Sequence, residues 1–190
     1  MTMKNKHLHR QARSAQGASL IVVLMILVIV SLLGVGGAQI ALMSERGARN
    51  DRDMQMAWQA AEAALIDAEL DMTTARTAEI NGKSKIAFIQ GCGTTGRSIG
   101  LCDTNLTRPE WLTVDFSDTS SSAPTVQFGA FTGRSFATGG IGIQPAQAPR
   151  YLIEIMQDPS DSSAYIYRVT AMGFGPRADI QAVLQMLYRV

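Results

Sequence analysis

The chain has 190 residues, of which 46% are hydrophobic and 17% charged, and a formal net charge of +1. This length accommodates one ordinary domain, or one domain with an appended segment, and the apolar content and near-zero net charge exclude a disordered chain. The balance of 17 basic against 16 acidic residues predicts no nucleic-acid-binding surface. Both histidines, His7 and His9, lie before residue 10. A histidine-based zinc site or a Ser-His-Asp triad is therefore excluded from the rest of the chain.

A charge-free apolar run follows a short basic segment at the amino terminus. The basic side chains of this segment are Lys4, Lys6, Arg10 and Arg13. No Asp, Glu, Lys, Arg or His occurs in residues 14–44, and no second run of this kind follows. As a helix, Ala18 to Met43 would be about 39 Å long, enough to cross a hydrocarbon core of about 30 Å. The basic flank predicts a single span with its amino terminus in the cytoplasm and the remainder outside.

Small residues within the run leave two questions open. The run can be an uncleaved anchor, or a secretory signal peptide in which Gly36-Gly37-Ala38 permits cleavage before Gln39. Gly34, Gly36 and Gly37 each cost a helix up to about 1 kcal/mol relative to alanine. They fit a close helix-packing face in lipid, or a place where the helix unwinds as it leaves the membrane.

Residues 45–72 continue as an alanine-rich helical segment without proline. Apolar residues recur at spacings of four and three, which predicts one buried stripe facing the rest of the protein. Its members are Met54, Trp58, Ala61, Leu65, Ala68 and Met72. Acidic and basic residues, Asp67 among them, are assigned to the other faces. Glu62 has two interpretations, a solvated residue or a hydrogen-bonding residue between subunits.

Residues 73–190 are predicted to form a β-rich domain, packed on the amphipathic helix in an α+β fold. Three runs rich in β-branched and aromatic residues, 150–157, 164–173 and 179–189, are joined by turn sequences. They predict a three-stranded antiparallel meander in which Tyr165, Tyr167, Val169 and Ala171 share one face. Residues 85–90 and 112–116 are weaker strand candidates. Residues 117–123 and 132–147 are predicted loops.

Taken together, the two ends of the chain resemble a type IV pilin precursor of the PilX minor-pilin type. Four segments carry the resemblance. They are Gly17-Ala18-Ser19-Leu20-Ile21-Val22, the helical segment Ala57 to Leu65, and the carboxyl-terminal stretches Tyr167 to Gly175 and Ala182 to Arg189. It implies a cleaved leader (1–17), a membrane and filament-core helix (18–44), an amphipathic helix (45–72) and a globular domain (73–190). A prepilin peptidase would cut after Gly17 and Ala18 would be methylated.

One position departs from the pilin pattern. Most pilins have Glu as the fifth residue after the cut, where this chain has Val22. In pilins that carboxylate is thought to neutralise the amine of a neighbouring subunit, and burying either charge alone in lipid costs a few kcal/mol. The departure argues against a repeating filament subunit and favours a protein present in few copies, at a tip or in an initiating complex.

The resemblance also implies partners and a location. We expect assembly with other minor pilins and the major pilin, contact with a large tip adhesin, and a role in adhesion and twitching motility. The candidate helix-packing residues are Val22, Gly34, Gly36, Gly37, Trp58 and Glu62. The chain would be a single-pass inner-membrane protein before assembly and a component of the pilus tip after it. No enzymatic activity, metal, cofactor, nucleic acid or small-molecule substrate is expected.

Cys92 and Cys102 flank nine residues that include several glycines. Because this segment is predicted to face an oxidising compartment, a disulfide is the expected state. Two free thiols, or half of a metal site, are the alternatives. The surrounding glycines, Gly91, Gly93 and Gly96, match the spacing of a dinucleotide-binding loop. That interpretation requires a helix to begin at the loop, which the sequence after it does not predict.

Two carboxylate pairs, Asp115 with Asp118 and Asp158 with Asp161, lie among Ser, Thr and Pro. Solvated turns explain them better than calcium binding, because the ligands are too sparse for an EF-hand loop.

Two other functions remain open. One is a tip pseudopilin of a type II secretion system, distinguished by the absence of an adhesin partner. The other is a secreted or membrane-anchored binding module with no filament role, distinguished by its mature amino terminus.

Overall fold

The computed structural model describes residues 18–104, 108–139 and 142–189. The proposed leader, residues 1–17 with Gly17, lies outside the described residues. The chain forms two compact units that divide after Ala48.

A single helix, α1, runs from Ala18 to Leu70 and accounts for the described part of the first unit. The segment contains no proline, so every backbone N–H is available to continue the helical ladder. Gly34, Gly36 and Gly37 lie inside the helix without interrupting it.

A π-helical turn, Asp71–Ala75, ends the helix. The Thr74 hydroxyl donates to the carbonyl of Leu70 at 2.6 Å, and the backbone N–H of Arg76 donates to the carbonyl of Asp71 at 2.8 Å. These bonds satisfy carbonyl groups that would otherwise lack partners at a helix end. The predicted helical segment therefore ends close to the expected residue.

Three long strands form the body of the sheet in the second unit: β4 (Arg150–Asp158), β5 (Asp161–Phe174) and β6 (Gln181–Arg189). These three strands pair with one another antiparallel, which confirms the predicted meander. The predicted face is also confirmed, since Tyr167, Val169 and Ala171 belong to one buried cluster and the partly buried Tyr165 packs against it.

The sheet is mixed, where a purely antiparallel one was expected. The short strands β1 (Ile89–Gln90) and β2 (Leu101–Asp103) pair in parallel, and β2 pairs in parallel with β4. The long connection between β2 and β4 supplies the crossover that a parallel pair needs. Strand β3 (Val126–Gln127) pairs antiparallel with the start of β4.

Two strand predictions need correction. Residues 112–116 form no strand; a 3-10 helix occupies Glu110–Leu112 instead. The backbone N–H of Glu110 donates to the buried carboxylate of Glu154 at 2.8 Å, so it is not available to a strand ladder. Of residues 85–90, only Ile89 and Gln90 pair.

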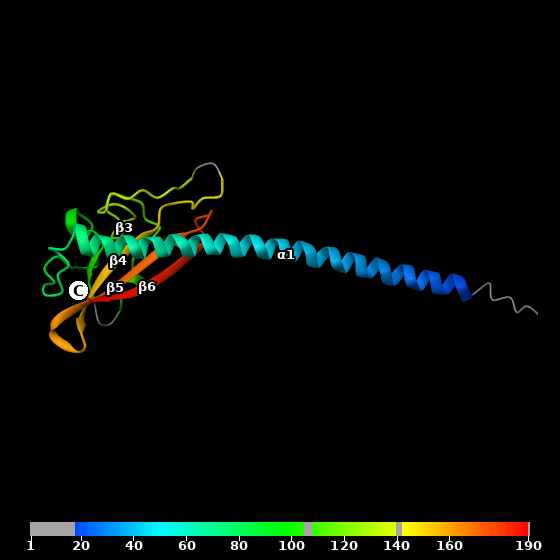
Figure 1. Ribbon diagram of the computed structural model, residues 1–190, viewed down its shortest axis with the longest axis horizontal. Helices are drawn as coiled ribbons and strands as arrows, with labels where there is room; N and C mark the ends of the chain where they lie inside the picture. The colour runs from blue at the N-terminus through cyan, green and yellow to red at the C-terminus, as the bar shows by residue number, and fades with distance from the viewer. Residues whose placement is uncertain (1–17, 105–107, 140–141, 190) are drawn as a thin grey trace, which may run out of the picture. The chain divides into compact units, whose positions relative to one another are not determined.

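The second half of α1 lies across the sheet (Figure 1). Its alanines face the sheet. Ala57, Ala61, Ala64 and Ala68 are fully buried. A Cβ on Gly173 of β5 would lie only 2.1 Å from the Ala57 carbonyl oxygen and 2.3 Å from the Ala61 nitrogen. The helix backbone therefore approaches the sheet as closely as these small residues permit.

This packing corrects the predicted stripe. Ala61, Ala68 and Met72 are buried as expected, but Met54 and Trp58 are exposed and Leu65 is only partly buried. The buried face is rotated toward the small residues because the space next to Gly173 admits alanine and no larger side chain. Asp67, assigned to a solvated face, is fully buried.

A second cluster packs on the opposite face of the sheet. It contains Cys92, Cys102, Phe116 and Leu152 and is flanked by Trp111, Val114 and Met172. The cystine is therefore part of a core.

Candidate functional site

The first half of α1 is apolar on every side. Large apolar side chains from Leu20 to Met43, including Val22, are half or more exposed. A Cβ added at Gly34, Gly36 or Gly37 would meet no atom within 4 Å. By length and composition this is a helix that can span a membrane.

The second half of α1 carries large apolar side chains on its exposed side as well. Met54, Trp58, Ile66 and Leu70 follow one another at intervals of four or eight residues; Trp58 is 50% exposed and Ile66 59%. We call these four residues the α1 ridge. The Trp58 indole N–H donates to the Glu62 carboxylate at 2.9 Å. Glu62 lies four residues after Trp58 and four before Ile66, so it occupies the position between them in this row. Alanine faces the sheet and large apolar groups face outward. A helix that packs only on its own domain would direct its large apolar side chains toward the sheet.

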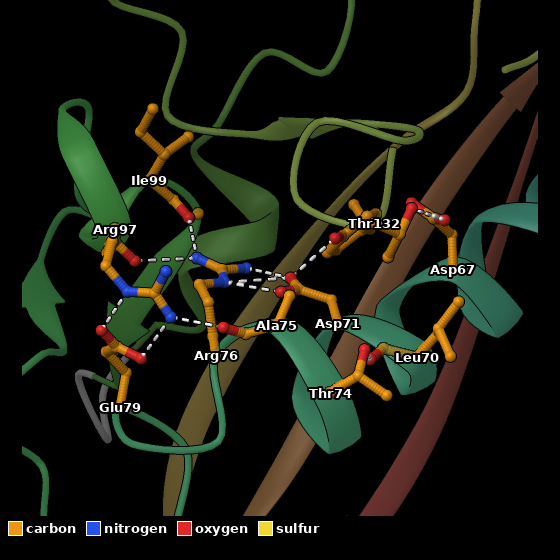
Figure 2. Close-up of polar contacts among 12 residues, drawn as sticks. Asp67, Leu70, Asp71, Thr74, Ala75, Arg76, Glu79, Arg97, Ile99 and Thr132 are labelled. Atoms are coloured by element: carbon orange, nitrogen blue, oxygen red, sulfur yellow. Dashed lines mark hydrogen bonds and ion pairs between the residues drawn. The ribbon is translucent and has the colours of Figure 1, made fainter. Parts of the chain in front are cut away.

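A buried ion pair anchors the end of α1 to the domain (Figure 2). Both Asp71 and Arg76 are fully buried. The Arg76 Nε donates to the two Asp71 carboxylate oxygens at 2.9 and 3.0 Å, and its Nη2 also contacts that carboxylate. The Arg76 Nη1 donates to the carbonyls of Arg97 and Ile99 at 3.0 and 2.7 Å. One guanidinium thus joins the helix end to the cystine loop, with its charge and its hydrogen bonds satisfied.

The same carboxylate reaches the sheet. The Tyr151 hydroxyl of β4 donates to Asp71 Oδ2 at 2.7 Å. Burial of the phenol raises the pKa of Tyr151 far above its ordinary value, and the adjacent Asp71 charge adds to the effect. Tyr151 therefore remains a neutral donor at any physiological pH.

Asp67 makes a second attachment, one turn earlier. Its carboxylate accepts a bond from the backbone N–H of Gly129 at 2.7 Å and from the Thr132 hydroxyl at 2.6 Å, with Arg134 3.6 Å away. Asp67 and Asp71 are four residues apart, so both project from the alanine face. Together they join α1 to the loop after β3 and to the cystine loop.

Cys92 and Cys102 form the expected disulfide, across a separation of 10 residues. The enclosed segment contains a 3-10 helix, Gly96–Ser98, and a short parallel bridge between Gly93 and Ile99. No α-helix begins in this described segment, so the glycines form a cystine loop that lacks the helix amino terminus of a dinucleotide site.

The paired carboxylates were predicted to lie in solvated turns. Asp115 and Asp118 lie in a loop, whereas Asp158 ends β4 and is buried, and Asp161 begins β5. Asp115, Asp118, Asp158 and Asp161 each accept a 2.8 Å bond from the backbone N–H of a serine two residues later. Serine donors lower the pKa of Asp118, Asp158 and Asp161. In the described part of the chain, no group of three or more His, Cys, Asp or Glu side chains is arranged to hold a metal ion.

The sequence-predicted assembly residues therefore lie in two groups, Val22 and the three glycines in the first unit and Trp58 with Glu62 in the second. Ala18 is the first residue of α1. The buried anchors Asp67, Asp71 and Arg76 were missed. The available signal was that Asp67 and Asp71 share a helix face with Ala64 and Ala68, but an acid on an alanine face is equally compatible with a solvated helix.

Comparison with known proteins identifies the family. The PilX N-terminal family model matches residues 16–65. The model described as type IV pilus assembly protein PilX C-term matches residues 46–190. No curated protein and no solved structure matches. The two family models overlap on the second half of α1 and include all of the structural features described above. The chain therefore belongs to the PilX family of type IV pilus assembly proteins and is a PilX-type minor pilin.

Proposed function

We propose that the protein takes part in initiating pilus assembly, within a tip complex of minor pilins that also presents an adhesin. The observation that carries this proposal is the exposure of large apolar side chains along both halves of α1. Apolar area removed from water contributes about 25 cal/mol per Å². Exposed apolar surface of this extent indicates an interaction site.

The first step in this proposal is processing of the leader. A prepilin peptidase cuts between Gly17 and Ala18, and the new amino group of Ala18 is methylated. The charge-free run then holds the protein in the inner membrane, with the β-rich domain in the periplasm. Val22 carries no charge, so this subunit offers no carboxylate to a neighbour's amine, which suits a subunit present in few copies.

The second step is bundling of α1 with the helices of other minor pilins and the major pilin. In this arrangement Gly34, Gly36 and Gly37 permit close approach in the first unit. The α1 ridge supplies large side chains in the second, with Trp58 held in one orientation by Glu62. The chain is then a substrate of the peptidase and a structural component of the fibre.

The deciding measurement is the amino-terminal mass of the protein purified from native membranes. A fragment that starts at Ala18, with or without one methyl group, supports processing as a pilin. A start at Gln39 would mean cleavage of a signal peptide and a released domain. An intact Met1, from cells that have the peptidase, would leave a plain membrane anchor.

A variant pair tests the α1 ridge. Trp58→Ala should reduce surface pili at least several-fold, because it removes the largest exposed side chain of the proposed helix interface, while the protein level in immunoblots stays unchanged. Leu112→Ala is the matched control, since Leu112 is also a half-exposed apolar residue but lies in a 3-10 helix away from α1. Equal piliation in both strains would contradict the proposed bundling surface. Lost protein secretion with normal pili would favour a secretion system.

A further inference from the structure

The two edges of the sheet differ in length. On one side β1, β2 and β3 are two or three residues long. On the other, β6 has nine residues and pairs with β5 in unbroken register from Ile166 opposite Arg189 to Phe174 opposite Gln181. No described strand pairs with the outer edge of β6. That edge therefore offers a row of unpaired backbone donors and acceptors.

Strand β6 lacks the features that protect exposed edges from other chains. Its sequence, Gln181 to Arg189, contains no proline, lysine or acid. Its single charge, Arg189, is at its end and is paired with Asp158 at 2.7 Å. No bulge interrupts its pairing with β5. Short strands, internal charges, prolines and bulges are the usual protections, and the opposite edge has the first of them.

Side chains along β6 are incompletely covered on both faces. On the helix side, Ala182 is buried, but Leu184, Met186 and Tyr188 remain only partly buried. On the other side, Val183 is 42% and Leu187 68% exposed. An additional strand would cover both rows, because its side chains would alternate between the same two faces.

We propose that β6 is a docking edge for an extended segment of another protein, which adds a strand to this sheet. Main-chain hydrogen bonds would supply affinity, and the alternating side chains specificity. The proposal goes beyond initiation of assembly and does not depend on the α1 ridge.

A second copy of this chain fits the edge poorly. Antiparallel pairing of two β6 strands about Gln185 would place the α1 segments, residues 49–70, on the same side of the joined sheet but running in opposite directions. Helices that enter from one membrane run in the same direction. Parallel pairing of two β6 strands would reverse the two faces of one sheet relative to the other. Gln185 of one copy would then lie on the same face as Leu184 and Met186 of the other, among apolar side chains. The occupant is therefore a strand of a different protein.

The composition of β6 defines the chemistry of that strand. Its side chains on the α1 side must be apolar, to lie beside Leu184, Met186 and Tyr188. It has no proline at the alternate positions whose N–H faces β6, because those N–H groups are needed for the ladder. An acidic residue near the end that meets Arg189 can share that guanidinium with Asp158, since the Arg189 side chain is 63% exposed and carries the only charge on the strand.

The test uses the full chain in detergent micelles and a synthetic probe, the capped peptide Asp-Val-Thr-Val-Thr-Val-Thr-Val. Paired antiparallel to β6, this probe brings its Asp to Arg189. In the free chain, alternate β6 amides should exchange with deuterium at least tenfold faster than those bonded to β5. Saturating probe should slow the fast amides at least tenfold. The same peptide with alternate amides N-methylated, so that its ladder donors are removed, should give no protection.

Variants make the result specific to β6. Val183→Lys combined with Leu187→Lys should weaken probe binding at least tenfold, whereas Leu112→Lys should leave it unchanged. The N-methylated peptide serves the same purpose without altering the protein, should the double variant fail to fold. Uniform protection of β6 in the free chain, or no slowing by the probe, would overturn the proposal. Equal protection by a peptide that copies residues 181–189 would overturn the assignment to a different protein.

Discussion

At the scale of single residues, Arg76 joins three parts of the domain. Its guanidinium pairs with Asp71 at the end of α1, donates to two carbonyls of the cystine loop, and lies 3.9 Å above the ring of Phe131. A fully buried charge is tolerated only where a partner neutralises it. Removal of one member therefore costs more than removal of both.

Arg76→Met should destabilise the folded domain by about 3–5 kcal/mol, because it leaves the Asp71 carboxylate buried and unpaired. Combining Arg76→Met with Asp71→Asn should restore part of that loss. Urea unfolding of the full chain, followed by tryptophan fluorescence, measures both. Arg52→Met is the control, since Arg52 pairs with Asp53 on the surface, and it should change little. A double variant less stable than the single one would contradict the neutralising role of Arg76.

The serine-bonded aspartates predict a pH dependence of stability. Serine hydroxyl and backbone donors lower the pKa of Asp158 and Asp161 in the folded protein. Between the lowered folded pKa values and the unfolded values, the folded state therefore binds fewer protons than the unfolded state. The resulting stabilisation is complete above the unfolded pKa values and is lost as pH falls through the lower folded ones.

Ser160→Ala combined with Ser163→Ala should flatten this dependence, because it removes the hydroxyl donors and leaves the carboxylates. Urea midpoints measured between pH 7 and pH 3 check it. The wild-type midpoint should fall more steeply than that of the variant across the acidic range. Identical slopes would show that these donors do not control the acid response.

At the scale of elements, the contact between α1 and β5 depends on the missing side chain of Gly173. Its neighbours on the helix are alanines, and no larger side chain fits between the two backbones. The helix can then turn its large side chains outward, where they form the α1 ridge. Close packing inward and apolar exposure outward are thus two consequences of one contact.

Gly173→Ala should destabilise the domain by about 1–3 kcal/mol or more, since the added Cβ would lie 2.1 Å from the Ala57 carbonyl oxygen and the backbones must separate. Gly36→Ala is the matched control in α1, where nothing lies within 4 Å. That change should be neutral or slightly favourable for helix formation. Thermal unfolding followed by near-ultraviolet circular dichroism compares the two. Equal stability of the Gly173 variant and the wild type would contradict the close approach.

At the scale of the whole molecule, the cystine loop stabilises a domain in which much of the chain forms loops and short strands. The disulfide joins residues separated by 10 positions and lies against Phe116 and Leu152. A cross-link of this loop length stabilises a fold by about 3 kcal/mol through the unfolded state. The same loop supplies the two carbonyls that bind Arg76, so its closure also supports the buried ion pair.

Replacing both cysteines by alanine should therefore lower the free energy of unfolding by about 3 kcal/mol. Hydrogen exchange of residues 93–100 should accelerate more than that of β4 and β5, because the loop loses its covalent closure while the sheet keeps its ladder. Mass spectrometry of peptides from the exchanged full chain measures both regions. Uniform acceleration would mean that the loop is held by its packing alone.

The sequence by itself determined the elements that local chemistry controls. A charge-free run without proline forms a helix, alternating β-branched and aromatic residues form β4 to β6, and the Asp-x-Ser sequences bond their own serines. The pair Cys92–Cys102 followed from the predicted compartment. The PilX resemblance followed from the residues at both ends of the chain and agrees with the family matches.

Only the tertiary structure decided which side of α1 is buried. The spacing of apolar residues indicated a stripe that includes Trp58, but the available volume next to Gly173, more than a hundred residues later in the chain, selects alanine. The burial of Asp71 and Arg76 depends likewise on Tyr151 and on carbonyls of the cystine loop. The parallel pairing of β2 with β4 is a further example. All three features depend on residues that are distant in sequence, and local periodicity carries no information about such partners.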